Sequence, residues 1–285
     1  MVNTVILTRK RKHIITRVLT YSIASIVAVI FFFPLYYTLI NSLRDVYSTP
    51  AMLLPKGFEV INYYYAVTLV PFFQYLLNSG IILLIGMGTD LIFNFLYGYA
   101  LARLRAPGKG IVFMLILSQM MVPFIAIQIP QYILFSTLGL KDTYWIYAIN
   151  ALAGNSLIVF MYRQYMMDFP HSIEEAALID GCSVYSIIWR IIAPLSKPIV
   201  AVVIFKDFIY YWNDYMTPYM YLSAEKYPVA MALFGVSYTF PNNPNLKLVP
   251  VQSAAAMLIL IPSTIIFFLC QKQLVQGVTA GGIKE

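Results

Sequence analysis

The sequence predicts an all-α membrane protein with six transmembrane helices. Of its 285 residues, 60% are hydrophobic and 11% are charged, whereas soluble domains carry about 25% charged residues. About 20 apolar residues span a bilayer, and charges are absent from five long runs, at 18–43, 66–89, 110–140, 143–162 and 248–271. These runs lack the alternation of strands, and single segments in lipid must be helical because every backbone N–H needs an internal partner.

The predicted spans cover 17–42, 73–102, 111–137, 143–166, 199–222 and 249–271. They form a transmembrane domain at 17–272, between an N-terminal tail at 1–16 and a C-terminal tail at 273–285. A basic run at 9–12 precedes the first span. The apolar run that follows is longer than the roughly 15 residues of a signal-peptide core, so we expect this span to be retained.

The distribution of Lys and Arg predicts the orientation of the chain. These residues concentrate in the two tails and in the segments after the second and fourth spans, and such an excess marks the cytoplasmic side. We therefore expect both termini, and a polar insert at 167–198, to be cytoplasmic. The net charge of +7 is spread along the chain, so we expect no nucleic-acid partner. Two longer segments, 43–72 and 223–248, then face outward.

The insert at 167–198 is predicted to form a helix, a glycine and a second helix. Ser172 and Glu175 have the spacing of a capping box, in which each side chain satisfies a free backbone N–H. Ala176 and Ala177 favour continuation of the helix and give it a small-residue face. Gly181 can adopt the left-handed conformation that ends a helix.

The second helix of the insert is predicted over 184–192. Ser183 precedes it at the N-cap position. Pro194 and Pro198 follow it, and proline inside a helix removes a hydrogen bond and clashes with the preceding turn. We therefore expect the chain to turn back toward the membrane at these prolines.

The spacing of the insert resembles the cytoplasmic EAA loop of ABC-importer permeases. Glu175-Ala176-Ala177 is followed by Gly181, and then by Ile191 and Ala193-Pro194, where the family usually has Leu in place of Ala193. The resemblance implies that the helix at 173–181 docks on an ATPase subunit. The residues implied in this coupling are Glu174, Glu175, Ala176, Ala177, Asp180 and Gly181.

Other segments resemble the carbohydrate permeases of the maltose type, on the side of the MalG-like subunit. They lie at 41–44, 78–79, 98–103, 107–109, 139–143, 212–215 and 277–284. This resemblance implies the type I ABC importer permease fold in a bacterial or archaeal plasma membrane. It also implies that the C-terminal tail touches the ATPase pair through Gly281 and Lys284, although Gly282 and Glu285 replace the family's usual Ala and Gly.

The resemblance also implies the partners. They are a second, MalF-like permease subunit, two ATP-binding subunits, an extracytoplasmic solute-binding protein, and a sugar substrate, expected to be an oligosaccharide or glycoside. The chain has no G-x-x-x-x-G-K-[ST] motif and therefore no phosphate cradle of its own. We expect no cofactor, with ATP and Mg bound by the partner ATPase subunits. His13, His171, Cys182 and Cys270 show no metal-ligand spacing, so no metal is expected.

Polar residues inside the predicted spans are candidates for a translocation path, because such groups normally face the bundle interior. They are Lys206, Tyr211, Trp212, Asn213, Asp214, Asn94 and Gln128. Two interpretations remain open: these groups line a sugar path, or they pack one helix on another. We favour packing, because a motif shared among transporters of different sugars suits architecture better than specificity.

Three other functions are alternatives to a sugar permease. A permease of the same superfamily for an amino acid, peptide or phosphate is disfavoured by the motif at 212–215 and by the C-terminal tail. An intramembrane enzyme would need catalytic groups at membrane depth, and no other span is expected to bring an acid to Asp207 and Asp214. We therefore expect no catalytic residue and no enzyme activity. A stand-alone channel would not need the capped insert.

Overall fold

The computed structural model describes residues 2–48 and 57–282. Among these residues every regular element is a helix, and the β structure is limited to an isolated bridge between Phe240 and Asn243. The predicted all-α fold class is therefore confirmed. The chain divides into two compact units, unit 1 at 1–69 and 238–258 and unit 2 at 70–237 and 259–285.

Unit 1 contains α1 (Val2–Ser42), α2 (Ile61–Thr68) and the first turns of α15 (Val249–Gly282). The side-chain amide of Asn62 donates to the carbonyls of Ser42, at 3.0 Å, and of Arg44, at 2.6 Å. Asn62 is fully buried, so it fastens α2 to the end of α1. Between residues 15 and 35, α1 exposes its apolar side chains, as expected for a helix that meets lipid or another subunit.

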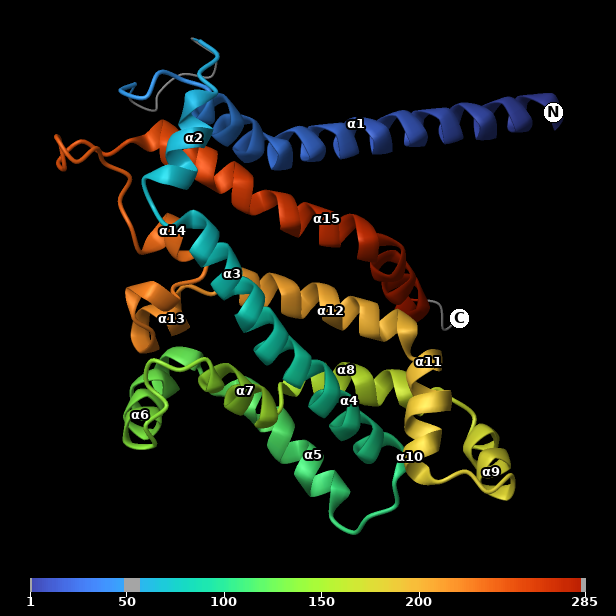
Figure 1. Cartoon of the computed structure of the whole chain (residues 1–285). Helices are drawn as coiled ribbons and strands as arrows, with labels where there is room; N and C mark the ends of the chain where they lie inside the picture. Colours follow the sequence, from blue (N-terminus) through green and yellow to red (C-terminus); the bar gives the residue numbers. More distant parts are fainter. Residues whose placement is uncertain (1, 49–56, 283–285) are drawn as a thin grey trace. The chain divides into compact units, whose positions relative to one another are not determined.

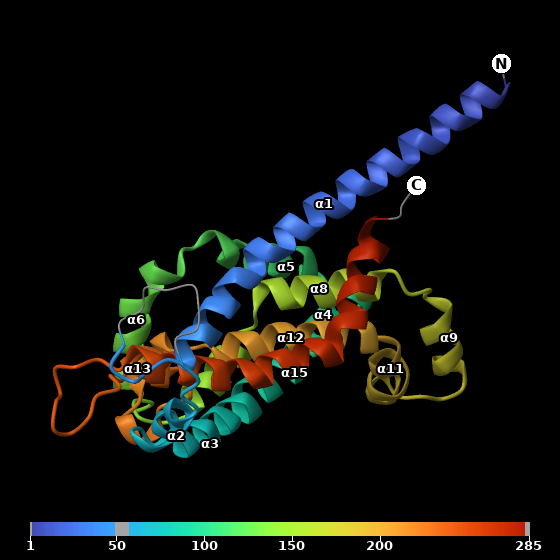
Figure 2. The ribbon, with the colours of Figure 1, turned by 90° about the horizontal axis from the view of Figure 1, so that it is seen from above.

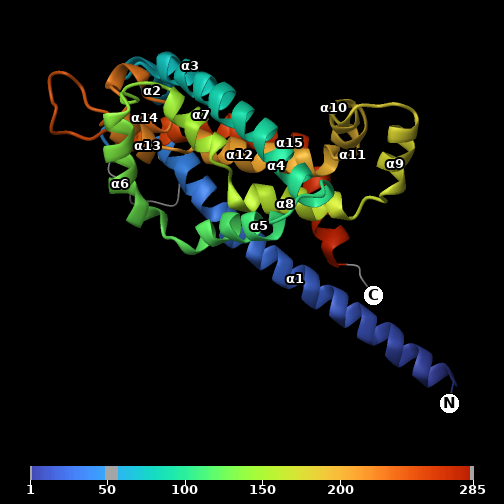
Figure 3. The ribbon, with the colours of Figure 1, turned by 90° about the horizontal axis from the view of Figure 1, so that it is seen from below.

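Unit 2 contains the remaining elements, with the rest of α15. They are α3 (Phe72–Ile82), α4 (Gly88–Arg103), α5 (Lys109–Ser118), α6 (Phe124–Thr137), α7 (Trp145–Leu152), α8 (Ser156–Met167), α9 (Ser172–Ile179), α10 (Val184–Ile187), α11 (Ala193–Leu195), α12 (Lys197–Trp212), α13 (Met216–Tyr221) and α14 (Met231–Phe234). Within this unit, α9 lies at one end, and α6 and α13 lie at the other (Figures 1, 2 and 3).

Three helices are long and apolar enough to cross a membrane, at Ile15–Ser42, Phe72–Arg103 and Val249–Val275. Three more candidates are bent pairs, Lys109–Met121 with Phe124–Thr137, Trp145–Leu152 with Ser156–Met167, and Val184–Leu195 with Lys197–Trp212, at angles of 104°, 48° and 79°. The described residues thus hold three spans, or six if each bent pair counts as one. Pro123 stands at the first bend, and Gly154, with φ +86°, stands at the second.

The fifth predicted span, 199–222, is shorter in the structure. α12 ends at Trp212, and α13 begins only at Met216. The Asn213 amide donates to the Ile209 carbonyl at 2.8 Å, and an Asp214 carboxylate oxygen accepts from the Thr217 N–H at 3.0 Å. Side chains of this kind offer the backbone an alternative to the helix, which explains the break.

The second helix of the insert is longer than predicted. It runs from Val184 through a π-helical turn at Ile188–Ile192 to Leu195, so Pro194 lies inside it. A π turn leaves backbone groups out of the regular i to i−4 pattern, and proline has no N–H to contribute to that pattern. The expectation that Pro194 stops the helix was therefore wrong. The chain turns at Ser196 instead, and Pro198 lies in the first turn of α12.

The core of unit 2 forms where α4 and α8 run parallel. A Cβ placed on Gly98 would lie 2.4 Å from the Cβ of Tyr162, so the two helices touch almost backbone to backbone. The Phe95 ring meets the Tyr162 ring edge-on, with centroids 5.3 Å apart. Nearby buried side chains complete the cluster: Tyr99, Ile158, Met166, Ala177, Ile187, Ile188, Ile192 and Val203.

A second network fastens two connections of unit 2 to α3, at the end opposite α9. The Asn78 amide donates to the carbonyls of Glu225 and Tyr227, at 2.9 and 3.0 Å, and its oxygen accepts from the Tyr144 hydroxyl at 3.0 Å. Asp142, at φ +59°, accepts from the Ser223 N–H at 2.9 Å and pairs with Lys226 at 3.0 Å. The loops around 142 and 225 are thereby tied to α3.

We predict that Gly98→Ala destabilises the protein by about 1–3 kcal/mol, because the added methyl group forces α4 away from α8. Thermal unfolding in detergent measures the loss. The matched control is Gly88→Ala on the same helix, where a Cβ would meet nothing within 4 Å. Equal melting temperatures for the two variants would contradict the close approach.

Asp142 gives a pH prediction. The Ser223 N–H and the Lys226 ammonium hold the pKa of its carboxyl below the ordinary value. Its contribution to stability is therefore present above the unfolded pKa of about 3.9 and is lost as pH falls through the folded pKa. Asp142→Asn should lower the melting temperature at pH 7, and the difference from wild type should shrink below about pH 4.

The control for the pH prediction is Asp168→Asn, at an exposed carboxylate. It removes the same charge without removing these partners. A difference between Asp142→Asn and wild type that stays constant from pH 7 to below about pH 4 would show that the carboxylate does not act through its charge.

Candidate functional site

The helix at one end of unit 2, α9, ends as the sequence predicts. The Gly181 N–H donates to the Leu178 carbonyl at 3.1 Å, and the Cys182 N–H donates to the Ala177 carbonyl at 2.9 Å. Gly181 has φ +79°. This is the Schellman pattern, with glycine in the left-handed position after the helix. The predicted cap at Ser183 is also present, since its hydroxyl accepts from the Ser186 N–H at 3.2 Å.

The start of α9 differs from the prediction. Ser172 is the first helical residue rather than the N-cap, and the cap residue, His171, makes no side-chain hydrogen bond to the helix. The predicted capping box of Ser172 and Glu175 is therefore absent. Glu175 is exposed, while Glu174 turns inward and pairs with Arg103, with Nε and Oε2 2.9 Å apart. The first turn of α9 is therefore held by a long-range ion pair through Glu174, and Glu175 takes no part in it.

The six predicted coupling residues divide between two faces of the α9 corner. Glu175, Ala176, Asp180 and Gly181 are exposed, whereas Ala177 is buried and Glu174 is largely buried. Four apolar side chains beside the exposed group also face outward: Leu178, Ile179, Val184 and Tyr185, with Ile179 at 87% exposure. We call these eight exposed residues the docking face. An exposed apolar patch with a polar rim is typical of a protein interaction site.

Arg103, the last residue of α4, holds this corner in place. Its side chain is 1% exposed. Besides Glu174, it donates to the carbonyls of Phe169 at 2.8 Å, Pro170 at 3.3 Å and Met166 at 3.4 Å. The guanidinium thus joins the ends of α4 and α8 to the first turn of α9. These contacts could not be predicted from the local sequence, because the partners lie more than 60 positions away.

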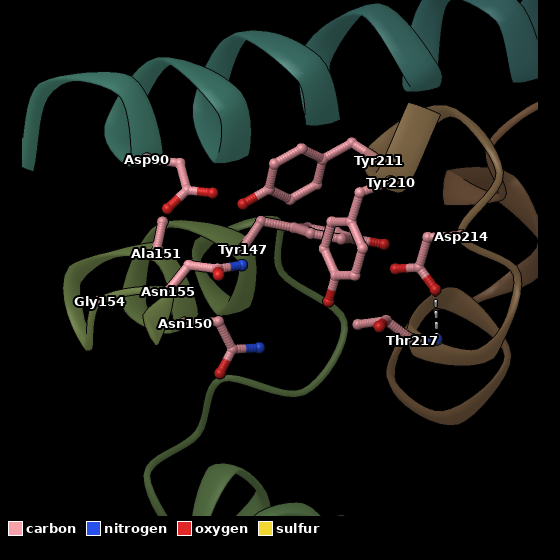
Figure 4. A pocket seen from close by; sticks show the side chains of 10 residues that line it. All are labelled: Asp90, Tyr147, Asn150, Ala151, Gly154, Asn155, Tyr210, Tyr211, Asp214 and Thr217. Carbon is pink, nitrogen blue, oxygen red and sulfur yellow. Dashed lines mark hydrogen bonds between the residues drawn. The ribbon is translucent and has the colours of Figure 1, made fainter. Parts of the chain in front are cut away.

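A cavity of about 130 Å³ lies inside unit 2. Its lining comes from α4, α7, the α7–α8 connection, the end of α12 and the start of α13, and consists of Asp90, Tyr147, Asn150, Ala151, Gly154, Asn155, Tyr210, Tyr211, Asp214 and Thr217. Figure 4 shows two carboxylates and three phenol rings around it. The Tyr147 hydroxyl is buried near the Asp214 carboxylate and makes no hydrogen bond of ordinary geometry within the described residues. Carboxylates, amides and phenols suit a polyhydroxylated ligand.

The expectation that no other span brings an acid to Asp214 was wrong, because Asp90 meets it across the cavity. Asp90 lies on α4 and lines the same cavity as Asp214. Its burial, at 3% exposure, and its hydrogen bonds to Asn94 hold it there. The available signal was a lone carboxylate within the second predicted span, since such a residue is a candidate functional site by default.

Two predicted path residues, Tyr211 and Asp214, line the cavity, and a third, Gln128, lines a smaller cavity of about 20 Å³ beside it. The two cavities share Asn150, Tyr210 and Thr217. The Tyr211 ring lies against the π-helical turn Leu83–Met87 between α3 and α4, where a Cβ on Gly86 would lie 2.5 Å from its Cε1. These residues remain candidates for the path.

The other predicted path residues make structural contacts or stand apart from the cavity. Trp212 is buried, and its indole N–H donates to the Ile259 carbonyl at 3.0 Å. Asn94 is buried and accepts from the Asn155 N–H at 2.9 Å. Asn213 bonds its own helix end. Lys206 is half-buried and makes no ion pair within 4 Å in the described part of the chain.

The remaining predicted contacts lie in the C-terminal tail. Gly281 belongs to α15, which continues helically through Gly282. Lys284 lies outside the described residues. Over the part of the chain that the structure describes, His, Cys, Asp and Glu form no group of three or more that could hold a metal ion.

Comparison with known proteins places the chain in a family. Residues 94–280 match the family described as binding-protein-dependent transport system inner membrane component. The melibiose/raffinose/stachyose import permease protein MelC of Bacillus subtilis (strain 168) is 32% identical over 270 residues, covering 92% of this chain and 95% of the relative. The maltodextrin transport system permease protein MdxG of the same strain is 30% identical over 279 residues, covering 95% and 98%. The chain belongs to this family of inner-membrane transport components.

The fold has been seen in a solved assembly. A chain of a bacterial ABC transporter involved in the import of the acidic polysaccharide alginate matches with a TM-score of 0.78 at 24% identity, covering 90% of this chain and 96% of that chain. The predicted type I importer permease fold is confirmed. The protein is a transport permease subunit and not an enzyme, and the ATPase of such a system is a separate subunit.

Proposed function

We propose that this chain is one transmembrane subunit of an ATP-driven, binding-protein-dependent importer of sugars, with an oligosaccharide or glycoside as substrate. The observation that carries the proposal is the pairing of two features within unit 2. A rigid docking face stands at one end, and a cavity lined with carboxylates, amides and phenols lies between the helices. The relatives support the substrate class, since their names specify melibiose, raffinose, stachyose and maltodextrin. A non-sugar solute is not favoured by these relatives.

The docking face is proposed to seat in a socket of the ATPase subunit. Ile179 and Tyr185 supply apolar area, and Glu175 and Asp180 supply charge at its rim. Because the Schellman turn and the Arg103 contacts fix the corner, a movement of the ATPase is passed to the permease rather than absorbed by a flexible loop. Alternating access of the helix bundle would follow from that movement.

The remaining partners follow from the same proposal. They are a second, MalF-like permease subunit, two ATPase subunits that bind ATP and Mg, and an extracytoplasmic solute-binding protein. The chain itself needs no cofactor in this scheme. Both termini and the α9 corner are cytoplasmic, as the distribution of Lys and Arg predicts, and the C-terminal tail around Gly281 and Lys284 contacts the ATPase pair.

The first test is purification from the native membrane in mild detergent, followed by reconstitution into vesicles. A second permease and an ATPase should copurify, and ATP inside the vesicles should drive uptake of a labelled oligosaccharide presented with its binding protein. Recovery of this chain alone, or uptake that is independent of ATP, would refute the proposal.

We predict that Glu175→Lys and Gly181→Trp abolish copurification of the ATPase while membrane insertion stays intact. The first substitution reverses a charge on the docking face. The second adds bulk there and forces a non-glycine residue to φ +79°. Asp168→Lys, an equal charge reversal at another exposed position of the same insert, is the control and should copurify normally. Retention of the ATPase by both docking-face variants would refute the docking assignment.

We also predict that Tyr147→Phe raises the KM for sugar uptake about tenfold, as expected when a buried hydroxyl that bonds the substrate is removed. Folding should be unaffected, because this hydroxyl makes no hydrogen bond of ordinary geometry within the described structure. The control is Tyr162→Phe, which removes another buried and unpartnered hydroxyl away from the cavity. Equal uptake by both variants and wild type would place the path elsewhere.

A further inference from the structure

The guanidinium of Arg103 lies between the C-terminal end of α8 and the first turn of α9. α8 ends at Met167, and the last carbonyls of a helix have no partner within it. Three backbone carbonyls, those of Met166, Phe169 and Pro170, accept from this guanidinium. Those of Met166 and Pro170 also accept from the N–H groups of Phe169 and Ile173. The planar fork of the guanidinium reaches several acceptors at once, which the single ammonium of lysine cannot do.

The same guanidinium is the buried link to α9. Its Nε meets Oε2 of Glu174 at 2.9 Å, and the two side chains are 1% and 12% exposed. Glu174 lies in the first turn of α9, where a carboxylate also suits the helix dipole. α9 otherwise approaches this core through its buried Ala177, so the ion pair is its principal polar anchor.

The other end of the α4 and α8 pair reaches the cavity. Asp90 on α4 precedes Arg103 by 13 positions, or about 20 Å along a helix, and it lines the cavity with Asn155 at the start of α8. Between these ends the two helices are joined by the Asn94 to Asn155 hydrogen bond and by the close approach at Gly98. The pair therefore extends as one body from the cavity to the docking corner.

We propose that Arg103 is the positioning residue that makes α4 and α8 move with the docking helix, so that a displacement of α9 reaches the cavity lining. The inference rests on the proposed function. It assigns to α4 a role in transmitting the displacement of α9. This role is separate from docking itself, because Arg103 lies behind the docking face and not on it.

A purely structural role is the competing explanation, in which Arg103 only caps α8. Glu174→Gln separates the two roles. It leaves the guanidinium on its three carbonyls and removes the charge of the link to α9. Arg103→Lys keeps a cation but loses the planar fork that reaches the carbonyls and Glu174 together. Arg105→Lys, at an exposed arginine two positions beyond the end of α4, is the matched control.

The experiment compares these variants in the purified complex with its ATPase subunits, reconstituted in vesicles. ATPase copurification, ATP hydrolysis and sugar uptake are measured together, and uptake per ATP hydrolysed is the decisive quantity. We expect Arg103→Lys and Glu174→Gln to retain the ATPase and its hydrolysis while uptake per ATP falls about tenfold, a change typical of lost coupling between sites. Arg105→Lys should match wild type.

Two results would overturn the proposal. One is an unchanged uptake per ATP in Glu174→Gln together with a loss in Arg103→Lys, which would limit Arg103 to capping α8. The other is an equal loss in Arg105→Lys, which would show that the effect does not depend on the buried position of Arg103. If Arg103→Lys does not assemble, Glu174→Gln alone still decides, because it preserves the cap.

Hydrogen exchange separates failure of this inference from failure of the proposed function. Amides of 168–182 should exchange faster in Arg103→Lys and Glu174→Gln than in wild type or Arg105→Lys, whether or not the complex transports a sugar. Faster exchange with a wild-type complex that lacks ATP-driven uptake would refute the proposed function alone. Unchanged exchange would refute the positioning role alone.

Discussion

The guanidinium of Arg103 meets two electrostatic demands at once. A cation taken out of water is stable only with close partners, and the carbonyls after α8 need donors that the helix cannot supply. The guanidinium supplies donors to the carbonyls, and the carbonyls are close partners for the buried cation. Glu174 balances its charge. Removing one member of such a buried pair typically costs about 3–5 kcal/mol. The position of α9 in unit 2 therefore depends on an interaction in the helix core and not on the loop that carries it.

Rigid and bent elements are distributed differently along unit 2. α4 and α8 pack so closely that Gly98 leaves no room for a methyl group, and a close-packed pair has few alternative arrangements. The helices around them are interrupted, at Pro123, at Ser196 and again at 213–215. Such breaks are where a helical bundle changes shape at low cost. A displacement of α9 would thus be carried by the α4 and α8 pair and absorbed at these breaks.

The sequence predicted the features that depend on neighbouring residues. Apolar runs located the helices, Gly181 ended α9, and Ser183 capped the next helix, because each of these depends on a few adjacent positions. The features that depend on distant residues were not predicted. Glu174 follows Arg103 by 71 positions, so nothing in the local sequence indicates that they pair. The helix break after Trp212 was missed because the side-chain bonds of Asn213 and Asp214 compete with an apolar pattern that continues beyond them.

The motif at the end of α12 shows why the sequence alone could not distinguish residues that pack helices together from residues that line a path. Successive residues on a helix point about 100° apart, so Tyr211 and Trp212 cannot serve the same face. Tyr211 turns toward the cavity and Gly86, whereas Trp212 turns toward α15 and bonds the Ile259 carbonyl. Asp214 has both a structural role and a place at the cavity. One carboxylate oxygen accepts from the Thr217 N–H in the first turn of α13, and the side chain lines the cavity. A single motif can therefore be common to transporters of different sugars through Trp212 and still present substrate-facing groups through its neighbours.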